Sequence, residues 1–263
     1  MAVVASAAFR ESVSRRLAAA GCVAAAEEAD ELLGTAPDEA TLERWLVNRE
    51  AGVPLAWLVG GLLFAGQRVS VDAGVYVPRP QTEQLARRAA RLLAAATGPA
   101  GVWAADLCTG SGAVAAYLAA AVPSAAVVAV DIDGEAVACA RRNGLRAIIG
   151  DLGGALRTGA FDVVTAVAPY VPTGSLVLLP ADVQRYEPRR ALDGGEDGLA
   201  VVRRVIAEAA RLLRVGGWLL LEIGGDQDEV LVHELPAAGF TDLDTWCDED
   251  GDLRGLAARR PAS

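Results

Sequence analysis

The chain has 263 residues, 53% of them hydrophobic, and its 24 basic and 34 acidic side chains give a formal net charge of −10. All the basic residues are arginines, and there is a single histidine, His233. The absence of lysine excludes Schiff-base chemistry, a pyridoxal phosphate anchor and a Walker-type phosphate lysine, and one histidine excludes a zinc site built from several histidines.

Charge and cysteine usage narrow the partners and the location. An acidic chain is unsuited to broad binding of nucleic acid or anionic membranes, because both require a basic surface. The four cysteines are far apart and form no Cys-x-x-Cys pair, so they indicate neither a disulfide framework nor a metal site. No apolar run approaches the roughly 18 residues of a membrane span, and no basic segment opens a secretory signal. We therefore expect a cytoplasmic protein that binds no metal, no nucleic acid and no membrane.

The N-terminal region has the periodicity of helices. Apolar and charged residues follow helical spacing over Ser6–Ala20 and Val23–Leu33. Thr35 and Asp38 form a capping pattern that is expected to open a third helix ending near Glu50.

A linker and an alternating region follow these helices. Leu62–Phe64 and Arg68–Val71 predict a small hairpin, and a further helix is expected from Pro80 to about Ala96. After residue 98, strand-like and helix-like segments alternate, and strands this apolar predict an α/β fold with a parallel sheet covered on both faces. The predicted elements are the strands Val102–Leu107, Ala126–Asp131, Ala147–Ile149, Phe161–Val167 and Trp218–Ile223, the helices Ala113–Ala121, Glu135–Asn143, Leu199–Leu213 and Asp226–Ala238, and an edge hairpin of Asp242–Cys247 and Leu253–Arg259.

A glycine-containing loop joins the first of these strands to its helix. It spans Asp106–Gly112, and its glycines let the backbone turn sharply and approach a ligand closely. Asp131 ends the next strand, where a carboxylate accepts hydrogen bonds from both hydroxyls of a ribose. Loop, strand, helix and acid together predict a nucleoside cofactor, and a plain tight turn in a doubly wound sheet is the alternative.

Asp106 discriminates between nucleoside cofactors. A carboxylate at the start of the loop would repel a pyrophosphate but attract an ammonium or sulfonium group, which favours S-adenosyl-L-methionine over NAD. Asp151 follows the third predicted strand and is placed to contact an adenine amino group. The predicted cofactor-binding residues are Asp106, Cys108, Thr109, Gly110, Gly112, Asp131, Ile132, Asp151 and Leu152.

Several longer strings carry a family resemblance. They include Phe64-x-Gly66, Val77–Glu83, Asp106–Gly112, Asp131-x-Asp133, Phe161–Val164, Tyr186-Glu187-Pro188, Ala191–Gly195, Asp197–Leu199, Leu221–Gly224 and Gln227. In these strings the chain resembles the HemK-type protein-(glutamine-N5) methyltransferases, class I enzymes that use S-adenosyl-L-methionine. The resemblance implies a Rossmann-like seven-stranded methyltransferase domain in residues 76–263. It also implies a small helical substrate domain with a linker hairpin in residues 1–75.

The chain departs from that family at the catalytic loop. Where the family has Asn-Pro-Pro-Tyr, this sequence has Val167, Ala168, Pro169 and Tyr170. In the family, the asparagine side chain and a proline carbonyl accept hydrogen bonds from the target amide, and the tyrosine ring packs over it. Valine offers no acceptor, and the loss of a hydrogen bond worth about 1–3 kcal/mol would slow transfer roughly ten- to hundredfold.

Three functional hypotheses therefore remain open. The first is a methyltransferase of this ancestry with a different acceptor, such as an aromatic or indole-type metabolite, because an electron-rich ring needs an apolar slot rather than an amide-binding group. The second is retained methylation of glutamine in a peptide chain release factor or another protein, with the backbone carbonyls of Ala168 and Pro169 holding the amide. The third is an inactive regulator that binds the cofactor.

The remaining candidate residues lie in the same motifs. Glu187 is a candidate general base, and the alternative is a salt bridge to Arg189, Arg190 or Arg79. Arg79, between two prolines, is expected to fix the domain junction through a carboxylate, and a contact with substrate is the alternative. His233 is expected to be a helical residue remote from the chemistry. The predicted catalytic residues are Val167, Pro169, Tyr170 and Glu187, and the predicted substrate-binding residues are Arg79, Pro80, Ala168 and Tyr186.

Overall fold

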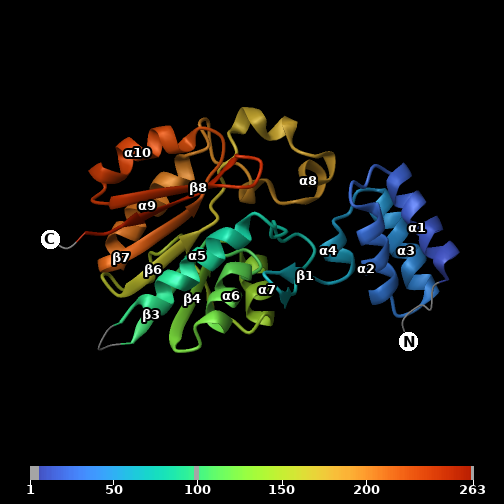
Figure 1. The fold of residues 1–263 in the computed structure, drawn as a ribbon, viewed down its shortest axis with the longest axis horizontal. Helices are drawn as coiled ribbons and strands as arrows, with labels where there is room; N and C mark the ends of the chain where they lie inside the picture. The colour runs from blue at the N-terminus through green and yellow to red at the C-terminus, as the bar shows by residue number, and fades with distance from the viewer. Residues whose placement is uncertain (1–5, 98–100, 262–263) are drawn as a thin grey trace.

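The structure is a computed structural model that describes residues 6–97 and 101–261. Three helices at the N-terminal end form a helical domain, which lies at one end of the molecule, away from the sheet (Figure 1). Their apolar faces meet in a shared core in which Leu17 and Leu32 are fully buried. The helices are α1 (Ala7–Ala19), α2 (Ala25–Thr35) and α3 (Glu39–Glu50).

Side-chain caps begin two of these helices. Ser6 accepts a hydrogen bond from the backbone N–H of Phe9, and Asp38 accepts one of 2.7 Å from the backbone N–H of Thr41. The sequence pattern assigned the start of the third helix to Thr35, and this detail is wrong. Thr35 is the last residue of α2, and Asp38, which is itself a strong N-cap residue, starts α3.

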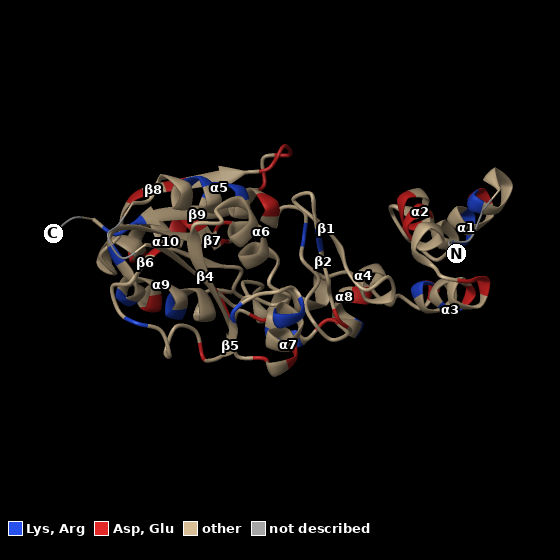
Figure 2. Cartoon of the chain, turned by 90° about the horizontal axis from the view of Figure 1, so that it is seen from below, with Lys and Arg blue, Asp and Glu red and all other residues tan. Residues whose placement is uncertain are grey.

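A short linker joins the helical domain to the larger domain, as the view from below shows (Figure 2). It contains the predicted hairpin, formed by the antiparallel strands β1 (Leu62–Phe64) and β2 (Gln67–Val69). It also contains α4 (Leu55–Leu58), which the sequence pattern did not predict. The division of the chain after residue 75 stays a prediction.

The larger domain is built on a seven-stranded sheet with the order β5-β4-β3-β6-β7-β9-β8. The first five of these strands are parallel, and β9 runs antiparallel to both of its neighbours. This confirms the predicted α/β class and the mostly parallel sheet. The strands are β3 (Val102–Leu107), β4 (Ala125–Asp131), β5 (Ala147–Ile149), β6 (Phe161–Ala166), β7 (Leu213–Glu222), β8 (Thr241–Cys247) and β9 (Leu253–Arg259).

Helices cover both faces of the sheet, and their buried residues form separate clusters on the two sides. The chain leaves β3 toward β4 and β5 and then returns to β6 on the other side of β3. The carboxyl ends of these strands therefore border the crevice in which open α/β sheets bind ligands. One face carries α5 (Thr82–Ala95), α6 (Ala113–Ala121) and α7 (Gly134–Arg142), and the other carries α9 (Ala200–Leu212) and α10 (Gln227–Ala237).

Between β6 and α9 the chain forms short elements that the periodicity did not predict. Each begins directly after a proline, whose fixed φ and missing N–H suit the start of a helical turn. They are a 3-10 turn at Thr173–Leu178, α8 (Ala181–Tyr186) and a 3-10 turn at Arg189–Ala191. None of the helices in the described part of the chain combines the length and apolarity that a membrane span requires.

Candidate functional site

A pocket of about 180 Å³ lies at the carboxyl ends of β3, β4 and β6. Of the predicted cofactor-binding residues, Gly112 alone does not line it. Gly112 instead begins α6 with a φ of 83°, and a Cβ there would lie 2.3 Å from the Leu145 side chain. The glycine is required for close packing of the helix rather than for contact with the pocket. Cys108, in the loop, adopts a positive φ of 54°.

Asp131 organises the loop that borders this pocket. Its carboxylate accepts a hydrogen bond of 2.8 Å from the backbone N–H of Gly110 and one of 2.9 Å from that of Asp133. Burial raises the pKa of Asp131, although these two backbone hydrogen bonds oppose the rise.

Asp106 is 2% exposed at the end of β3. Its carboxylate accepts hydrogen bonds from the hydroxyl of Thr109 at 2.5 Å and from that of Thr165 at 2.7 Å. Burial nevertheless raises the pKa of Asp106 to about 6. The loop therefore starts with a buried acid that hydroxyl groups hold in place without a compensating positive charge.

The other two acids of the pocket each pair with an arginine. Asp133 contacts Arg190 at 2.5 Å, and both oxygens of Asp151 accept hydrogen bonds from Arg204 at 2.7 and 2.8 Å. Within the described ranges, no arginine forms an ion pair with Asp106 or Asp131. The contact of Asp151 with an adenine amino group stays a prediction, and Arg204 is the partner that the structure gives it.

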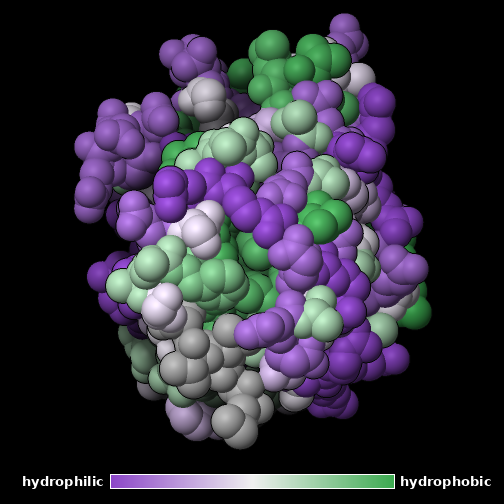
Figure 3. Space-filling view, turned by 90° about the vertical axis from the view of Figure 1, so that its right-hand side faces the viewer, coloured by the Kyte–Doolittle hydropathy of each residue, from purple (hydrophilic) through white to green (hydrophobic). Residues whose placement is uncertain are grey.

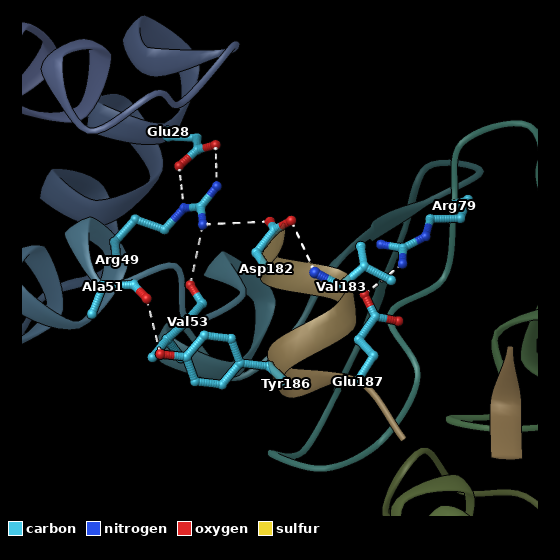
Figure 4. Close-up of polar contacts among 9 residues, drawn as sticks. All are labelled: Glu28, Arg49, Ala51, Val53, Arg79, Asp182, Val183, Tyr186 and Glu187. Atoms are coloured by element: carbon cyan, nitrogen blue, oxygen red, sulfur yellow. Dashed lines mark hydrogen bonds and ion pairs between the residues drawn. The ribbon is translucent and has the colours of Figure 1, made fainter. Parts of the chain in front are cut away.

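A second cavity, of about 840 Å³, forms a cleft between the helical domain and the loop that follows β6. We call it the acceptor cleft. Figure 4 shows the contacts that hold its walls together. Arg49 pairs with Glu28 at 2.6 Å, donates to the carbonyl of Val53 at 3.3 Å and lies 3.8 Å from Asp182 on α8. One arginine therefore links α2, α3, the linker and α8.

Tyr186, a predicted substrate-binding residue, lies in the wall of this cleft. Its hydroxyl donates a hydrogen bond of 2.9 Å to the carbonyl of Ala51, and its ring packs edge-on against Trp57 (Figure 4 shows the hydrogen bond). These contacts bring the end of α8 against the linker.

The catalytic loop lies between the two cavities. Val167 lines both, Ala168 and Tyr170 line the acceptor cleft, and Pro169 lines the pocket at the strand ends. The Tyr170 hydroxyl donates a hydrogen bond of 3.2 Å to Glu222, at the end of β7. These four consecutive residues thus lie between the two cavities, and their catalytic and substrate-binding roles stay predictions.

Glu222 is a site residue that the sequence reasoning missed, although it lies in the Leu-Glu-Ile-Gly string. It is 1% exposed, and its second oxygen accepts a hydrogen bond of 2.6 Å from Thr82 at the start of α5. Burial raises the pKa of Glu222. Glu222 therefore links the Tyr170 hydroxyl to the start of α5.

Glu187 lies outside both cavities. Its side chain is 1% exposed and forms an ion pair with Arg79, and its other oxygen accepts a hydrogen bond from the backbone N–H of Val77 (Figure 4 shows the ion pair). The structure therefore favours the salt bridge that was the alternative to a general base. Arg79 lines the cleft, whereas Pro80 lines neither cavity, and His233 is exposed on α10.

The chain is similar to known methyltransferases in family, sequence and structure. The family described as "Methyltransferase domain" matches residues 104–181. The release factor glutamine methyltransferase of Geobacter sulfurreducens is 36% identical over 230 residues, which cover 85% of this chain and 79% of that protein. The enzyme of the same name from Moorella thermoacetica is 39% identical over 252 residues, covering 86% and 87%.

Two further relatives bear on acceptor and fold. The 4-amino-L-phenylalanine/4-methylamino-L-phenylalanine methyltransferase of Streptomyces pristinaespiralis is 36% identical over 222 residues, covering 81% of this chain and 75% of that protein. Among solved structures, the Mtq2–Trm112 complex of E. cuniculi matches with a TM-score of 0.53 and 20% identity, covering 72% of this chain and 99% of that one. The structural match concerns the fold alone.

This protein is a class I S-adenosyl-L-methionine-dependent methyltransferase, because it is similar to such enzymes over most of both chains and has the sheet order described above. Within that class, the chain belongs to the HemK-type family of release factor glutamine methyltransferases. The predicted family, enzyme class and cofactor are thereby confirmed, which disfavours the hypothesis of an inactive regulator.

The pocket at the strand ends fits S-adenosyl-L-methionine. The ammonium and sulfonium cations of this cofactor would offset the charge of Asp106, which no described arginine pairs with. Asp131 lines the same pocket, where its contact with the ribose hydroxyls stays a prediction. The Ser111 hydroxyl is buried in the pocket wall without a hydrogen-bond partner in the described chain, which leaves it available to a ligand. Ile132, which is 64% exposed, and Leu152 offer apolar surface to an adenine ring.

Proposed function

We propose that this protein transfers methyl groups to the side-chain nitrogen of a glutamine in a peptide chain release factor or a similar protein. The observation that carries the proposal is the acceptor cleft, which offers about 840 Å³ between two domains. A single metabolite would fill a fraction of that space, whereas a loop or extended segment of a protein would fill it. The names of the relatives from Geobacter and Moorella support the same acceptor.

The backbone of the catalytic loop provides one hydrogen-bond acceptor for the target amide. The carbonyl oxygen of Pro169 packs closely against Gly194. A Cβ added to Gly194 would lie only 2.7 Å from this oxygen. Ala168 lines the cleft, whereas Pro169 does not, and no residue in the described ranges donates a hydrogen bond to the Ala168 carbonyl. Of the two carbonyls considered from the sequence, Ala168 therefore binds the amide.

Orientation is the main contribution of the protein to this reaction. When bound, S-adenosyl-L-methionine would supply the methyl group: its carbon–sulfur bond breaks as a carbon–nitrogen bond to the acceptor forms. The acceptor nitrogen loses one proton to solvent. Tyr170, fixed by Glu222, supplies a flat wall for the amide, and Ala168 holds one of its N–H groups. Such alignment of a weak nucleophile is worth several kcal/mol, and it needs no strong base in the site.

A small aromatic amine is the second candidate acceptor. Val167 favours it, because an aryl amine is a better nucleophile than an amide and has less need of a carboxamide to hold it. Three tyrosines line the cleft, and the relative from Streptomyces pristinaespiralis is named for an aromatic amino acid. They are Tyr76, Tyr170 and Tyr186.

The test measures methyl transfer to a protein acceptor and to a small acceptor after a bulky side chain has narrowed the acceptor cleft. Ala181 is exposed in the wall of the acceptor cleft, and Ala94 is exposed on α5, away from both cavities. With labelled methyl donor, Ala181→Trp should lose most methylation of a release factor while its cofactor affinity stays unchanged. Ala94→Trp should behave as the wild type does. Methylation of 4-aminophenylalanine but not of any release factor by the wild type would refute the proposal in favour of the second candidate.

A further inference from the structure

Methyl transfer must take place where the two cavities meet, because the donor occupies one and the acceptor enters through the other. Among the described residues, those that line both cavities are Tyr76, Val167 and Ala191. The side chains of Val167 and Ala191 are hydrocarbon. Tyr76 is therefore the residue that brings a polar side-chain atom to the junction.

Tyr76 is held in this position by its neighbours. The guanidinium carbon of Arg79 lies 4.9 Å from the centre of the Tyr76 ring, which is the geometry of a cation–π contact. Arg79 is itself fixed by its ion pair with the buried Glu187. The pair that sequence reasoning considered for general base chemistry thus acts as the support for a tyrosine at the junction.

The two tyrosine hydroxyls near the junction differ in their partners. The hydroxyl of Tyr170 donates its proton to Glu222. The Tyr76 hydroxyl oxygen accepts a hydrogen bond from the guanidinium of Arg79, and no carboxylate in the described chain accepts one from its O–H. Burial raises the pKa of the Tyr76 phenol and outweighs the opposing effect of Arg79, so the phenol stays protonated at neutral pH. Its oxygen keeps a second lone pair that can accept a hydrogen bond.

We propose that the Tyr76 hydroxyl oxygen accepts a hydrogen bond from the N–H of the methyl acceptor, at the place where Val167 provides no polar group. The inference rests on the proposed function in that the acceptor carries an N–H group. A primary amide has two such groups, and the carbonyl of Ala168 and the hydroxyl of Tyr76 bind one each. The amide is already planar, because its carbon–nitrogen bond has partial double-bond character. With both N–H groups held, the plane itself is fixed in the site, and the nitrogen stays directed at the donor.

The first test removes only the hydroxyl. Tyr76→Phe should lower kcat for a release-factor acceptor roughly ten- to hundredfold, the range expected for one hydrogen bond made in the transition state, while cofactor affinity stays unchanged. Tyr117 lies on α6 outside both cavities, so Tyr117→Phe is the matched control and should retain full activity.

A rescue separates hydrogen bonding from a merely structural role. Val167→Asn adds a carboxamide at the junction, and in the Tyr76→Phe background it should restore most of the lost kcat. In the wild-type background the same change should have little effect, because both N–H groups are already bound. Unchanged kcat in Tyr76→Phe, or a loss that Val167→Asn does not repair, would overturn the proposal.

A second measurement does not depend on turnover. In protein labelled with 3-fluorotyrosine, the ¹⁹F resonance of Tyr76 can be assigned with the Tyr76→Phe variant and followed during titration with propionamide and with aniline. A shift of this resonance that exceeds the shift at Tyr117 supports the contact, and no shift with both probes contradicts it. If the wild type methylates no release factor but the Tyr76 resonance responds to aniline, the proposed function fails while this inference stands.

Discussion

The ion pair between Arg79 and Glu187 yields a sharp prediction, because its two members differ in burial. The Glu187 side chain is 1% exposed, whereas that of Arg79 is 26% exposed. Arg79→Met leaves a carboxylate buried without its cation, which costs about 3–5 kcal/mol. Glu187→Gln leaves the guanidinium partly in water and keeps an acceptor for the N–H of Val77, so its cost is about 1–2 kcal/mol.

These energies translate into thermal shifts that are easily measured. In a domain of this size, 1 kcal/mol lowers Tm by about 2–4 °C, so Arg79→Met should lower it by roughly 6–20 °C. Glu187→Gln should lower it by less than half as much. The double variant should be more stable than Arg79→Met alone, because it no longer buries a charge.

The pH dependence has a defined sign. Burial raises the pKa of Glu187, and Arg79 opposes that rise, so the pKa rises further when Arg79 is removed. At pH values between the unfolded-state and the folded-state pKa, a carboxyl group whose pKa is raised by folding binds more protons in the folded state than in the unfolded state. The deficit of Arg79→Met should therefore shrink as the pH falls toward the unfolded-state value of about 4.3. Thermal unfolding followed by circular dichroism between pH 4.5 and 8 tests this. An Arg79→Met variant no less stable than Glu187→Gln would refute the reasoning.

Further predictions follow from the two cavities. Because a cationic ligand favours the charged form of Asp106, whose pKa is about 6, affinity for S-adenosyl-L-methionine should fall as the pH drops through 6. Titration calorimetry should find this step missing in Asp106→Asn, and an unchanged step would contradict the assignment. Arg49→Met should raise KM for a release factor without changing cofactor affinity, because the substitution removes the contacts of Arg49 with Glu28 and with Asp182 on α8. Steady-state kinetics with the release factor and the cofactor varied in turn check this. Gly112→Ala should lower the free energy of unfolding by about 1–3 kcal/mol, as measured by thermal unfolding. Residue 112 has a positive φ, which strains an alanine, and the added Cβ would clash with the Leu145 side chain.

Much of the fold could be predicted from local pattern. The strands β3, β4 and β5 are short apolar runs with a glycine or aspartate at or next to one end. Helix Ala113–Ala121 and the linker strand Leu62–Phe64 match the structure residue for residue. The short α8 could not be predicted, because six residues after a proline show too little periodicity. The error at Thr35 arose because two good capping residues lie close together, and only packing decides which one starts the helix.

The two sides of the site differed in how much sequence reveals. The cofactor loop is contiguous, so Asp106–Gly112 and the following strand end were enough to place the pocket. The acceptor side depends on contacts between distant positions, since Glu222 binds Tyr170 and Thr82 across 52 and 140 residues of sequence. Tyr76 precedes a recognised motif, but no local signal shows that its hydroxyl lies where two cavities meet.

The identity of the methylated atom tests the account most directly. A release factor, the same protein with each candidate glutamine changed to asparagine, and 4-aminophenylalanine should be offered at equal concentration with labelled methyl donor, and the label located by tandem mass spectrometry. We expect a single methyl group on the side-chain nitrogen of one glutamine, and its loss in the variant in which that glutamine is asparagine. Label found only on 4-aminophenylalanine would contradict it.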